Sequence, residues 1–148
     1  VQAQDIKIGY VNSERVLKEA NPAKAAQAKL EAELGKREKD LAEVANRLKA
    51  TADRLDKDGP TLSDTERTRR QRDLVEQDRE FQRKRREFQE DLNTRKNEEL
   101  SAVLERANKV IKQIFDQEKY DLIVQDAVHW SARVDITKKV IDALNAGK

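Results

Sequence analysis

Apolar residues recur at helical spacing through the first half of the chain. Between residues 23 and about 57, leucine and valine are separated by three, four or seven positions in a background of helix-forming residues. This spacing predicts one long helix with a narrow apolar seam, which is typical of a coiled coil. Pro22 suits the first turn of that helix, because its missing N–H has no intrahelical partner there.

A turn and a second helix are predicted next. Asp58, Gly59 and Pro60 form the strongest turn signal in the sequence. Ser63, with Glu66 three residues later, has the pattern of a capping box. The second helix is expected from residue 63 to about residue 118. Its seam contains three residues that are spaced one heptad apart, namely Leu74, Phe81 and Phe88. Residues 22–118 should therefore form a long antiparallel helical hairpin with its tip near residues 58–62.

Three residues interrupt this regular pattern. Arg37 and Asp78 occupy positions where an apolar residue would continue the stripe, and Gly35 in a helix interior costs about 1 kcal/mol relative to alanine. We expect the hairpin to flex at these positions. The interruptions are explained either by slack in a coiled coil or by bending that serves a function.

Alternating residues near the N-terminus predict a strand. Residues 6–11 place Ile6, Ile8 and Tyr10 on one face of this strand. Asn12 or Ser13 can then cap a short helix that ends near residue 17.

The C-terminal region changes from helical to strand periodicity. Residues 122–124 are a short apolar run, and residues 128–132 alternate, so two more strands are predicted with a turn at residues 126–127. Asp135 is placed to cap a last helix over residues 136–145, which Gly147 would end.

Together the two ends predict a small α/β body made of residues 1–21 and 119–148, so the fold class is mainly α. A body of roughly 50 residues is marginal as an independent core, so we expect self-association through strand edges and apolar faces. A closed symmetric ring would remove those edges. The expected oligomerisation residues are Ile6, Ile8, Tyr10, Leu122, Val124 and Trp130.

Composition supports long helices rather than a large globule. Of the 148 residues, 41% are charged and 36% are hydrophobic, which is too polar a mixture to fill a compact core of this size. Disorder would also fit this composition, but the helical spacing of the apolar residues favours helices. No apolar run approaches the roughly 20 residues that a membrane-spanning helix needs.

The sequence carries no pattern for catalysis, a metal or a cofactor. Cysteine is absent, and the single histidine, His129, has no partner nearby in the sequence. The carboxylates alternate with lysines and arginines, as expected for ion pairs along helices. The four glycines are isolated, so there is no phosphate-binding loop. We therefore predict a protein that is not an enzyme.

Clusters of basic residues are candidate contact sites for a client protein or an anionic surface. The net charge is only +2, and acidic residues are interleaved, so a solvated helix face explains the clusters as well as an anionic partner does. Such a partner would be lipid headgroups, lipopolysaccharide or an acidic client. Nucleic acid is disfavoured, because no aromatic residues are interleaved for stacking. The candidates are Arg67, Arg69, Arg70, Arg83, Lys84, Arg85, Arg86, Arg95 and Lys96.

Several stretches resemble the Skp (OmpH-like) family of periplasmic chaperones. They are KIGYVN at residues 7–12, FQEDL at 88–92, RKNEE at 95–99, YDLIV at 120–124 and DIT at 135–137. The resemblance covers nearly the whole chain, although the helical hairpin matches only in residue type. It implies a homotrimer whose strands join in a central β-barrel and whose helical arms surround a cavity.

The resemblance also implies a function. Members of the family hold unfolded outer-membrane proteins in the periplasm without ATP and prevent their aggregation. The pattern of residues 1–3 is that of a signal-peptidase site, which would make Gln4 the mature start, although an ordinary terminus explains these residues equally well. A structural coiled-coil adaptor that binds one folded partner is the alternative function.

Overall fold

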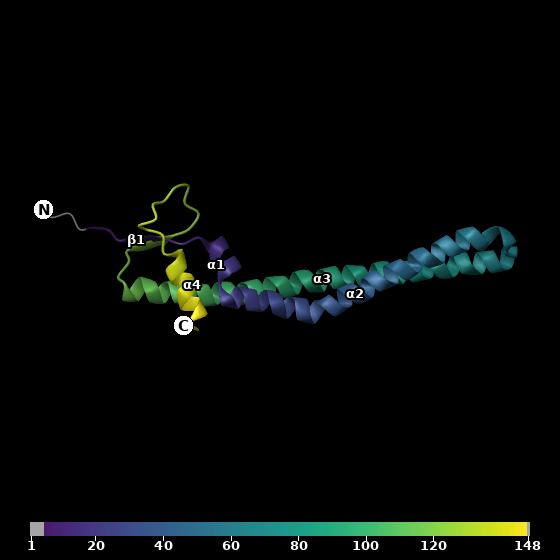
Figure 1. The fold of residues 1–148 in the computed structure, drawn as a ribbon, viewed down its shortest axis with the longest axis horizontal. Helices are drawn as coiled ribbons and strands as arrows, with labels where there is room; N and C mark the ends of the chain where they lie inside the picture. The colour runs from purple at the N-terminus through teal and green to yellow at the C-terminus, as the bar shows by residue number, and fades with distance from the viewer. Residues whose placement is uncertain (1–4, 148) are drawn as a thin grey trace. The chain divides into compact units, whose positions relative to one another are not determined.

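A computed structural model describes residues 5–147 of the chain (Figure 1). Its long helices and small sheet confirm the mainly α fold class. The signal-peptidase pattern lies outside the described residues. Within residues 5–147, no helix combines the length and the apolar character that crossing a membrane requires. In chain order, the elements are β1 (Ile8–Tyr10), α1 (Ser13–Glu19), α2 (Asn21–Asp58), the 3-10 helix η1 (Gly59–Thr61), α3 (Asp64–Gln117), β2 (Leu122–Val124) and α4 (Thr137–Asn145).

The residues divide into two compact units. Unit 1 comprises Val1–Lys29 and Lys96–Lys148, and unit 2 comprises Leu30–Arg95. The sequence predicts the boundaries between body and hairpin at residues 21/22 and 118/119, whereas the two compact units of the structure meet at residues 29/30 and 95/96. The reason is that the C-terminal part of α3 supplies Ala107, Val110 and Ile114 to the core of unit 1. That part of α3 cannot be separated from the body without opening its core.

The sheet of unit 1 is small and parallel. Ile8 lies opposite Leu122, and Tyr10 lies opposite Val124. On the other side of β1, the chain near residue 135 forms a single parallel bridge to Tyr10. The backbone N–H of Tyr10 donates to the carbonyl of Val134 at 2.7 Å, and the carbonyl of Tyr10 accepts from the N–H of Ile136 at 2.8 Å.

The predicted strand at residues 128–132 is wrong. These residues form loop and turn, and Val128 is 87% exposed. Alternation of apolar and polar residues is not sufficient for a strand, which also needs a neighbouring backbone for its hydrogen bonds. Among the described residues, the segment between β2 and α4 forms backbone hydrogen bonds with β1 only at Val134 and Ile136.

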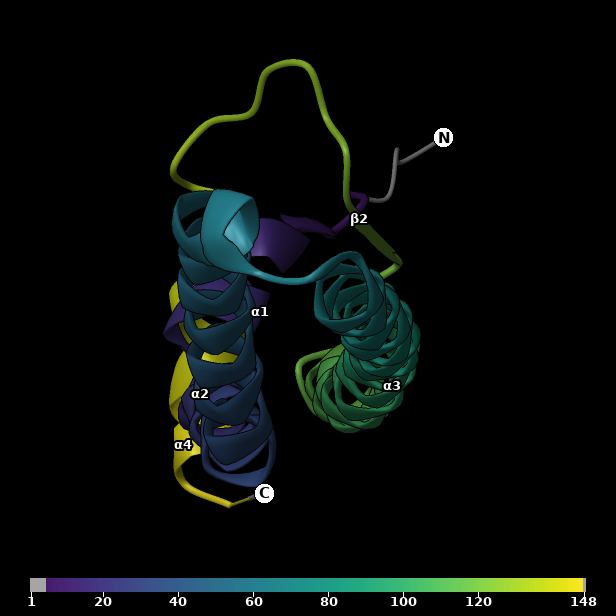
Figure 2. The ribbon, with the colours of Figure 1, turned by 90° about the vertical axis from the view of Figure 1, so that its right-hand side faces the viewer.

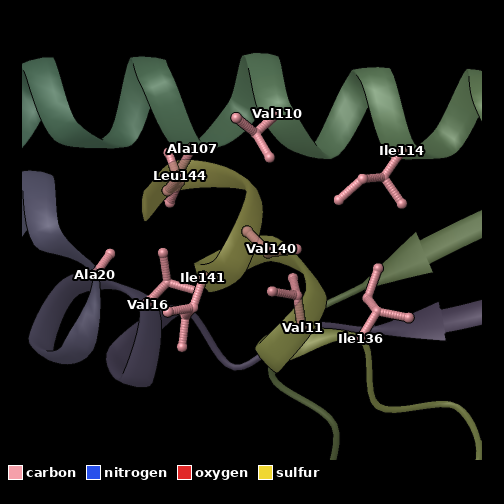
Figure 3. Packing of buried hydrophobic residues seen from close by; sticks show 10 residues of the cluster. All are labelled: Val11, Val16, Ala20, Ala107, Val110, Ile114, Ile136, Val140, Ile141 and Leu144. Carbon is pink, nitrogen blue, oxygen red and sulfur yellow. The ribbon is translucent and has the colours of Figure 1, made fainter. Parts of the chain in front are cut away.

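The core of unit 1 joins α1, α3 and α4 to the residues that flank β1 (Figure 3). Helix α4 carries the predicted apolar face, since Val140, Ile141 and Leu144 are all buried. Figure 3 shows α4 packed between α1 and α3. The ten buried core residues are Val11, Val16, Ala20, Ala107, Val110, Ile114, Ile136, Val140, Ile141 and Leu144.

The helix caps of unit 1 follow the sequence closely. The side chain of Asn12 accepts a hydrogen bond from the N–H of Arg15 at 3.2 Å and so caps α1. The Asp135 carboxylate accepts from the N–H of Thr137 at 2.9 Å at the start of α4. The buried hydroxyl of Thr137 in turn accepts from the N–H of Asn12 at 2.9 Å, which ties the starts of the two helices together.

Unit 2 is a pair of antiparallel helices, seen end-on in Figure 2. Two ion pairs set the register of α2 against α3: Glu33 with Arg95 at 3.0 Å, and Arg37 with Asp91 at 2.9 Å. The chain reverses at η1, within the residues where the sequence predicts the tip. The hydroxyl of Ser63 accepts from the N–H of Glu66 at 3.1 Å at the start of α3, which is one half of the predicted capping box.

The seam between these two helices is only partly closed. Leu34 and Phe88 are buried, whereas Leu41, Leu48 and Phe81 are half-buried. The predicted interruption at Arg37 is a contact between the helices, because its guanidinium pairs with Asp91 and lies 5.4 Å from the centre of the Phe88 ring. Arg37 therefore contributes an ion pair between the helices where an apolar residue would continue the stripe.

Candidate interaction surfaces

The apolar residues predicted for self-association lie on one face of the two-stranded sheet. Successive residues of a strand point to opposite faces. Ile123 packs against the core, and a Cβ on Gly9 would meet the Tyr120 ring at 3.1 Å and the Ile136 side chain at 3.2 Å, so these residues face inward. We name the opposite face the sheet face. It contains Ile8, Tyr10, Leu122 and Val124. Ile6 comes two residues before the start of β1, and Trp130 lies beside the sheet face because its ring stacks on Tyr10.

Several residues of this surface are exposed to solvent. Ile6 is 70% exposed, Leu122 is 49% exposed and Ile8 is 41% exposed. Exposed apolar side chains of this size that gather in one place mark a site of interaction. Strand β2 pairs with β1 and with no other strand of residues 5–147, so the sheet also has an open edge. An apolar face beside an open edge is suited to pairing with another strand.

Tyr10 is the buried member of this surface, because Trp130 covers it. The two rings stack with their centroids 4.0 Å apart and their planes inclined by 27°. The indole N–H of Trp130 donates to the Asp135 carboxylate at 3.3 Å. Partial burial acts to raise the pKa of Asp135, but hydrogen bonds from Thr137 and Trp130 outweigh it and hold that pKa below its ordinary value. Asp135 therefore remains a charged acceptor that anchors both the indole and α4.

Two of the predicted basic residues at the tip hold a carboxylate on their own helix. Arg69 and Arg70 both donate to Glu66, at 2.7 Å and 3.2 Å. These hydrogen bonds lower the pKa of Glu66 from 4.5 to about 2. The positive charge of this pair of arginines is thus partly neutralised.

Arg67 has a structural role at the tip. Its guanidinium donates to the carbonyl of Gly59 at 2.9 Å and to the carbonyl of Leu62 at 3.0 Å. A third contact joins it to Asp64 at 3.1 Å. Since these bonds close the turn between α2 and α3, Arg67 is less available to a client than the sequence suggests.

The cluster at residues 83–86 is divided between paired and unpaired side chains. Arg83 donates to Glu87 at 2.5 Å and makes a short contact with Glu80. Lys84 lies 4.0 Å from Glu80. Arg85 and Arg86 are exposed and form no ion pair with residues 5–147. The unpaired charge of this cluster is therefore on Arg85 and Arg86.

Of the last two predicted basic residues, one forms an ion pair between the helices and the other is exposed. Arg95 pairs with Glu33 across unit 2, whereas Lys96 in unit 1 is exposed. The pairing of Arg95 needs the register of the two helices, so sequence spacing did not indicate it. The pairings of Arg69 and Arg83 are different, since each has a glutamate three positions earlier. That spacing is a helical ion-pair signal.

Metal-ligating side chains do not gather in one place among residues 5–147. No group of three or more histidine, cysteine, aspartate or glutamate side chains could hold a metal ion there. His129 is exposed in the loop between β2 and α4.

Comparison with known proteins agrees with this architecture. A family model described as "Outer membrane protein (OmpH-like)" matches residues 7–144. The chain is also similar to a solved structure from Caulobacter crescentus CB15, described as a candidate outer membrane chaperone (OmpH-like). The TM-score is 0.82, with 21% sequence identity over 99% of this chain and 88% of that chain. At this identity the likeness shows the fold. No curated protein matches the chain significantly.

Proposed function

Because the chain belongs to the OmpH-like family of outer membrane proteins, we propose that it is a chaperone of the periplasm, secreted with a signal peptide that is removed. In this proposal the protein binds unfolded outer-membrane β-barrel proteins and prevents their aggregation. It works as a holdase, without ATP, a cofactor or catalysis. The solved structure that shares its fold is itself described as a candidate chaperone.

The observation that carries the proposal is the partly open seam of unit 2. Leu41, Leu48 and Phe81 keep part of their apolar surface accessible, and charged residues surround them. An unfolded barrel protein carries apolar side chains at alternate positions and cannot hide them in water. Many weak apolar and ionic contacts can hold such a chain without selecting one structure.

We further propose that the protein is a homotrimer joined through the sheet face. The apolar side chains and the open edge of β2 supply the surface that a second copy would cover. Strands from three copies would then close into a central barrel, and the helices of unit 2 would surround a cavity for one client. Burying the exposed part of a leucine or isoleucine side chain contributes about 1 kcal/mol for each residue.

Arg85, Arg86 and Lys96 support one additional proposal, contact with an anionic surface such as lipid headgroups or lipopolysaccharide. They are exposed and form no ion pairs among residues 5–147. Exposed cations of this kind attract anionic membranes, and the attraction weakens as salt is added.

An aggregation assay tests the proposed function. A urea-unfolded outer-membrane β-barrel protein is diluted into buffer without ATP, with and without this protein, and turbidity is followed. We expect suppression at about one trimer per client. Undiminished turbidity, with the protein folded and trimeric in the same sample, would contradict the holdase function and favour the adaptor that binds one folded partner.

A further inference from the structure

Apolar and polar layers alternate along the seam of unit 2. On α3, Leu74, Phe81 and Phe88 are seven residues apart. The second set of seam positions, also seven residues apart, contains Gln77 and Lys84 instead of apolar residues. A coiled coil closes its seam by filling both sets with apolar side chains. On this part of α3, apolar side chains therefore fill only one of the two sets of seam positions.

The polar layers leave hollows between the helices. One of these hollows, which residues of both α2 and α3 line, has a volume of about 510 Å³. A neighbouring hollow of about 270 Å³ shares Leu41, Val44 and Lys84 with it, so the two lie side by side, and together we name them the seam groove. The residues that define the floor and sides of its larger part are Leu41, Val44, Leu48, Thr51, Gln77 and Phe81.

Leu48 and Phe81 are open on both sides of the helix pair. They line the seam groove and also a hollow of about 480 Å³ with a different set of neighbours, which includes Val75. This double access explains why both residues are only half-buried although they lie at the centre of the seam. Volumes of several hundred Å³ suit small groups of atoms, such as a few side chains, and are too small for the surface of a folded domain.

The rim of the larger hollow has unbalanced charge. Its two carboxylates are already engaged, Glu80 by Arg83 and Glu76 by Arg79 at 3.2 Å. Arg47 forms no ion pair with residues 5–147, and Lys84 approaches Glu80 only at 4.0 Å. The larger hollow therefore offers apolar walls beside Arg47, a cation whose charge is not locally neutralised.

The smaller hollow has the opposite character at its rim. Asp40 lines it and forms no ion pair with the described residues, while Arg37 is neutralised by Asp91. The groove thus has a cationic end at Arg47 and an acidic end at Asp40. A ligand that carries a negative group at one end and a positive group at the other would therefore bind in one orientation.

We propose that the seam groove binds apolar side chains of an extended segment of an unfolded client, with an acidic residue of that segment beside Arg47. This inference rests on the holdase function proposed above and names the site and the kind of segment it takes. An unfolded segment fits because a hollow of about 510 Å³ has room for a few side chains and is too small for the surface of a folded domain. The acidic residue follows from charge complementarity with Arg47.

Closing the groove tests the proposal. The variant Thr51→Leu/Gln77→Leu adds apolar side chains to one polar layer of the seam. We expect it to raise the melting temperature and to bind a fluorescently labelled, urea-unfolded outer-membrane β-barrel protein about tenfold more weakly, since about one side-chain site is lost. The matched control is Thr68→Leu/Gln82→Leu, at exposed positions of α3 that do not line the groove. It should bind like the parent.

The charge of the groove is tested separately. Arg47→Glu leaves the apolar walls in place, and we expect it to bind the same client about fivefold more weakly at low salt, with a smaller difference at high salt. Arg72→Glu makes the same charge change at an exposed position that does not line the groove, and it should have less than half of this effect.

The possible outcomes distinguish a failure of the groove proposal from a failure of the proposed holdase function. If the parent holds the client and the filled variant binds equally well or more tightly, the groove proposal is wrong and the holdase function stands. If the parent does not hold the client, both are wrong. If dodecanoic acid binds the parent and is lost in the filled variant while client binding is unchanged, the groove takes an amphiphile and the peptide proposal is overturned.

Discussion

The indole of Trp130 covers the ring of Tyr10, with the ring centroids 4.0 Å apart. The two residues are 120 positions apart in the sequence, and the contact fixes the loop after β2 onto β1. Tyr10 is 5% exposed while Trp130 is 42% exposed, so the tryptophan acts as a cover for the tyrosine. The loop beside the sheet face is held by this stack and by the Asp135 carboxylate.

Removing this cover should destabilise unit 1. We expect Trp130→Ala to lower the free energy of unfolding by about 1 kcal/mol, which is typical for the loss of a stacked aromatic pair. Thermal unfolding followed by far-UV circular dichroism measures the change. Trp130→Phe, which keeps a ring but loses the hydrogen bond to Asp135, should lie between the parent and the alanine variant. Equal stability of the parent and Trp130→Ala would contradict this role.

A charge on the sheet face should prevent self-association. We expect Leu122→Lys to convert the proposed trimer to smaller species, because three lysines would then be brought into an apolar interface. Size exclusion with light scattering measures the mass. Leu100→Lys is the matched control, since Leu100 is 45% exposed on α3 and Leu122 is 49% exposed on the sheet face. Loss of the trimer in both variants would show that the effect is not specific to the sheet face.

Two glycines should respond in opposite ways to alanine. Gly9→Ala places a methyl group 3.1 Å from the Tyr120 ring and 3.2 Å from Ile136, and we expect about 2 kcal/mol of destabilisation. Gly35→Ala meets nothing within 4 Å and lies inside α2, so we expect about 1 kcal/mol of stabilisation from helix propensity. Urea unfolding measures both changes. A stabilising effect of Gly9→Ala would show that β1 is not packed against Tyr120.

Glu66 should make the stability of the tip depend on pH. Its pKa is lowered from 4.5 to about 2 by hydrogen bonds from Arg69 and Arg70. A carboxyl with a lower pKa in the folded state stabilises the fold above its unfolded pKa, and the contribution disappears as the pH falls through the folded pKa. We expect Glu66→Gln to melt below the parent at neutral pH. The difference should shrink between pH 4.5 and about pH 2.

Glu43→Gln is the control for this pH dependence, because Glu43 is exposed and forms no ion pair with residues 5–147. Added salt should reduce the effect of Glu66→Gln, since the ion pairs are accessible to solvent. A melting difference that stays constant from neutral pH to pH 2 would mean that the arginines do not hold Glu66 in its charged form.

The helices were predictable from the sequence because their signals are local. Apolar spacing and the residues around Gly59 and Ser63 place α2, η1 and α3 to within a few residues of the structure. The loop at residues 128–132 was predicted as a strand because its alternation is also local, whereas strand formation depends on a partner elsewhere.

Properties that depend on the pairing of distant residues could not be predicted. Ala107 and Val110 belong to the core of unit 1, although their helix has the same apolar spacing on both sides of the division. The pairing of Arg95 with Glu33 depends on the register of two helices, and spacing along one helix does not give that register. The apolar residues of the sheet face were predictable, because alternation along two short strands determines which side chains share a face.

The molar mass of a client complex tests the central claim most directly. The protein is mixed with a urea-unfolded outer-membrane β-barrel protein without ATP, and the soluble complex is measured by size exclusion with light scattering. We predict a mass equal to one client plus three times the 17.1 kDa of one chain, for several unrelated clients. A single chain of 17.1 kDa that leaves the clients aggregated would contradict both the trimer and the holdase function.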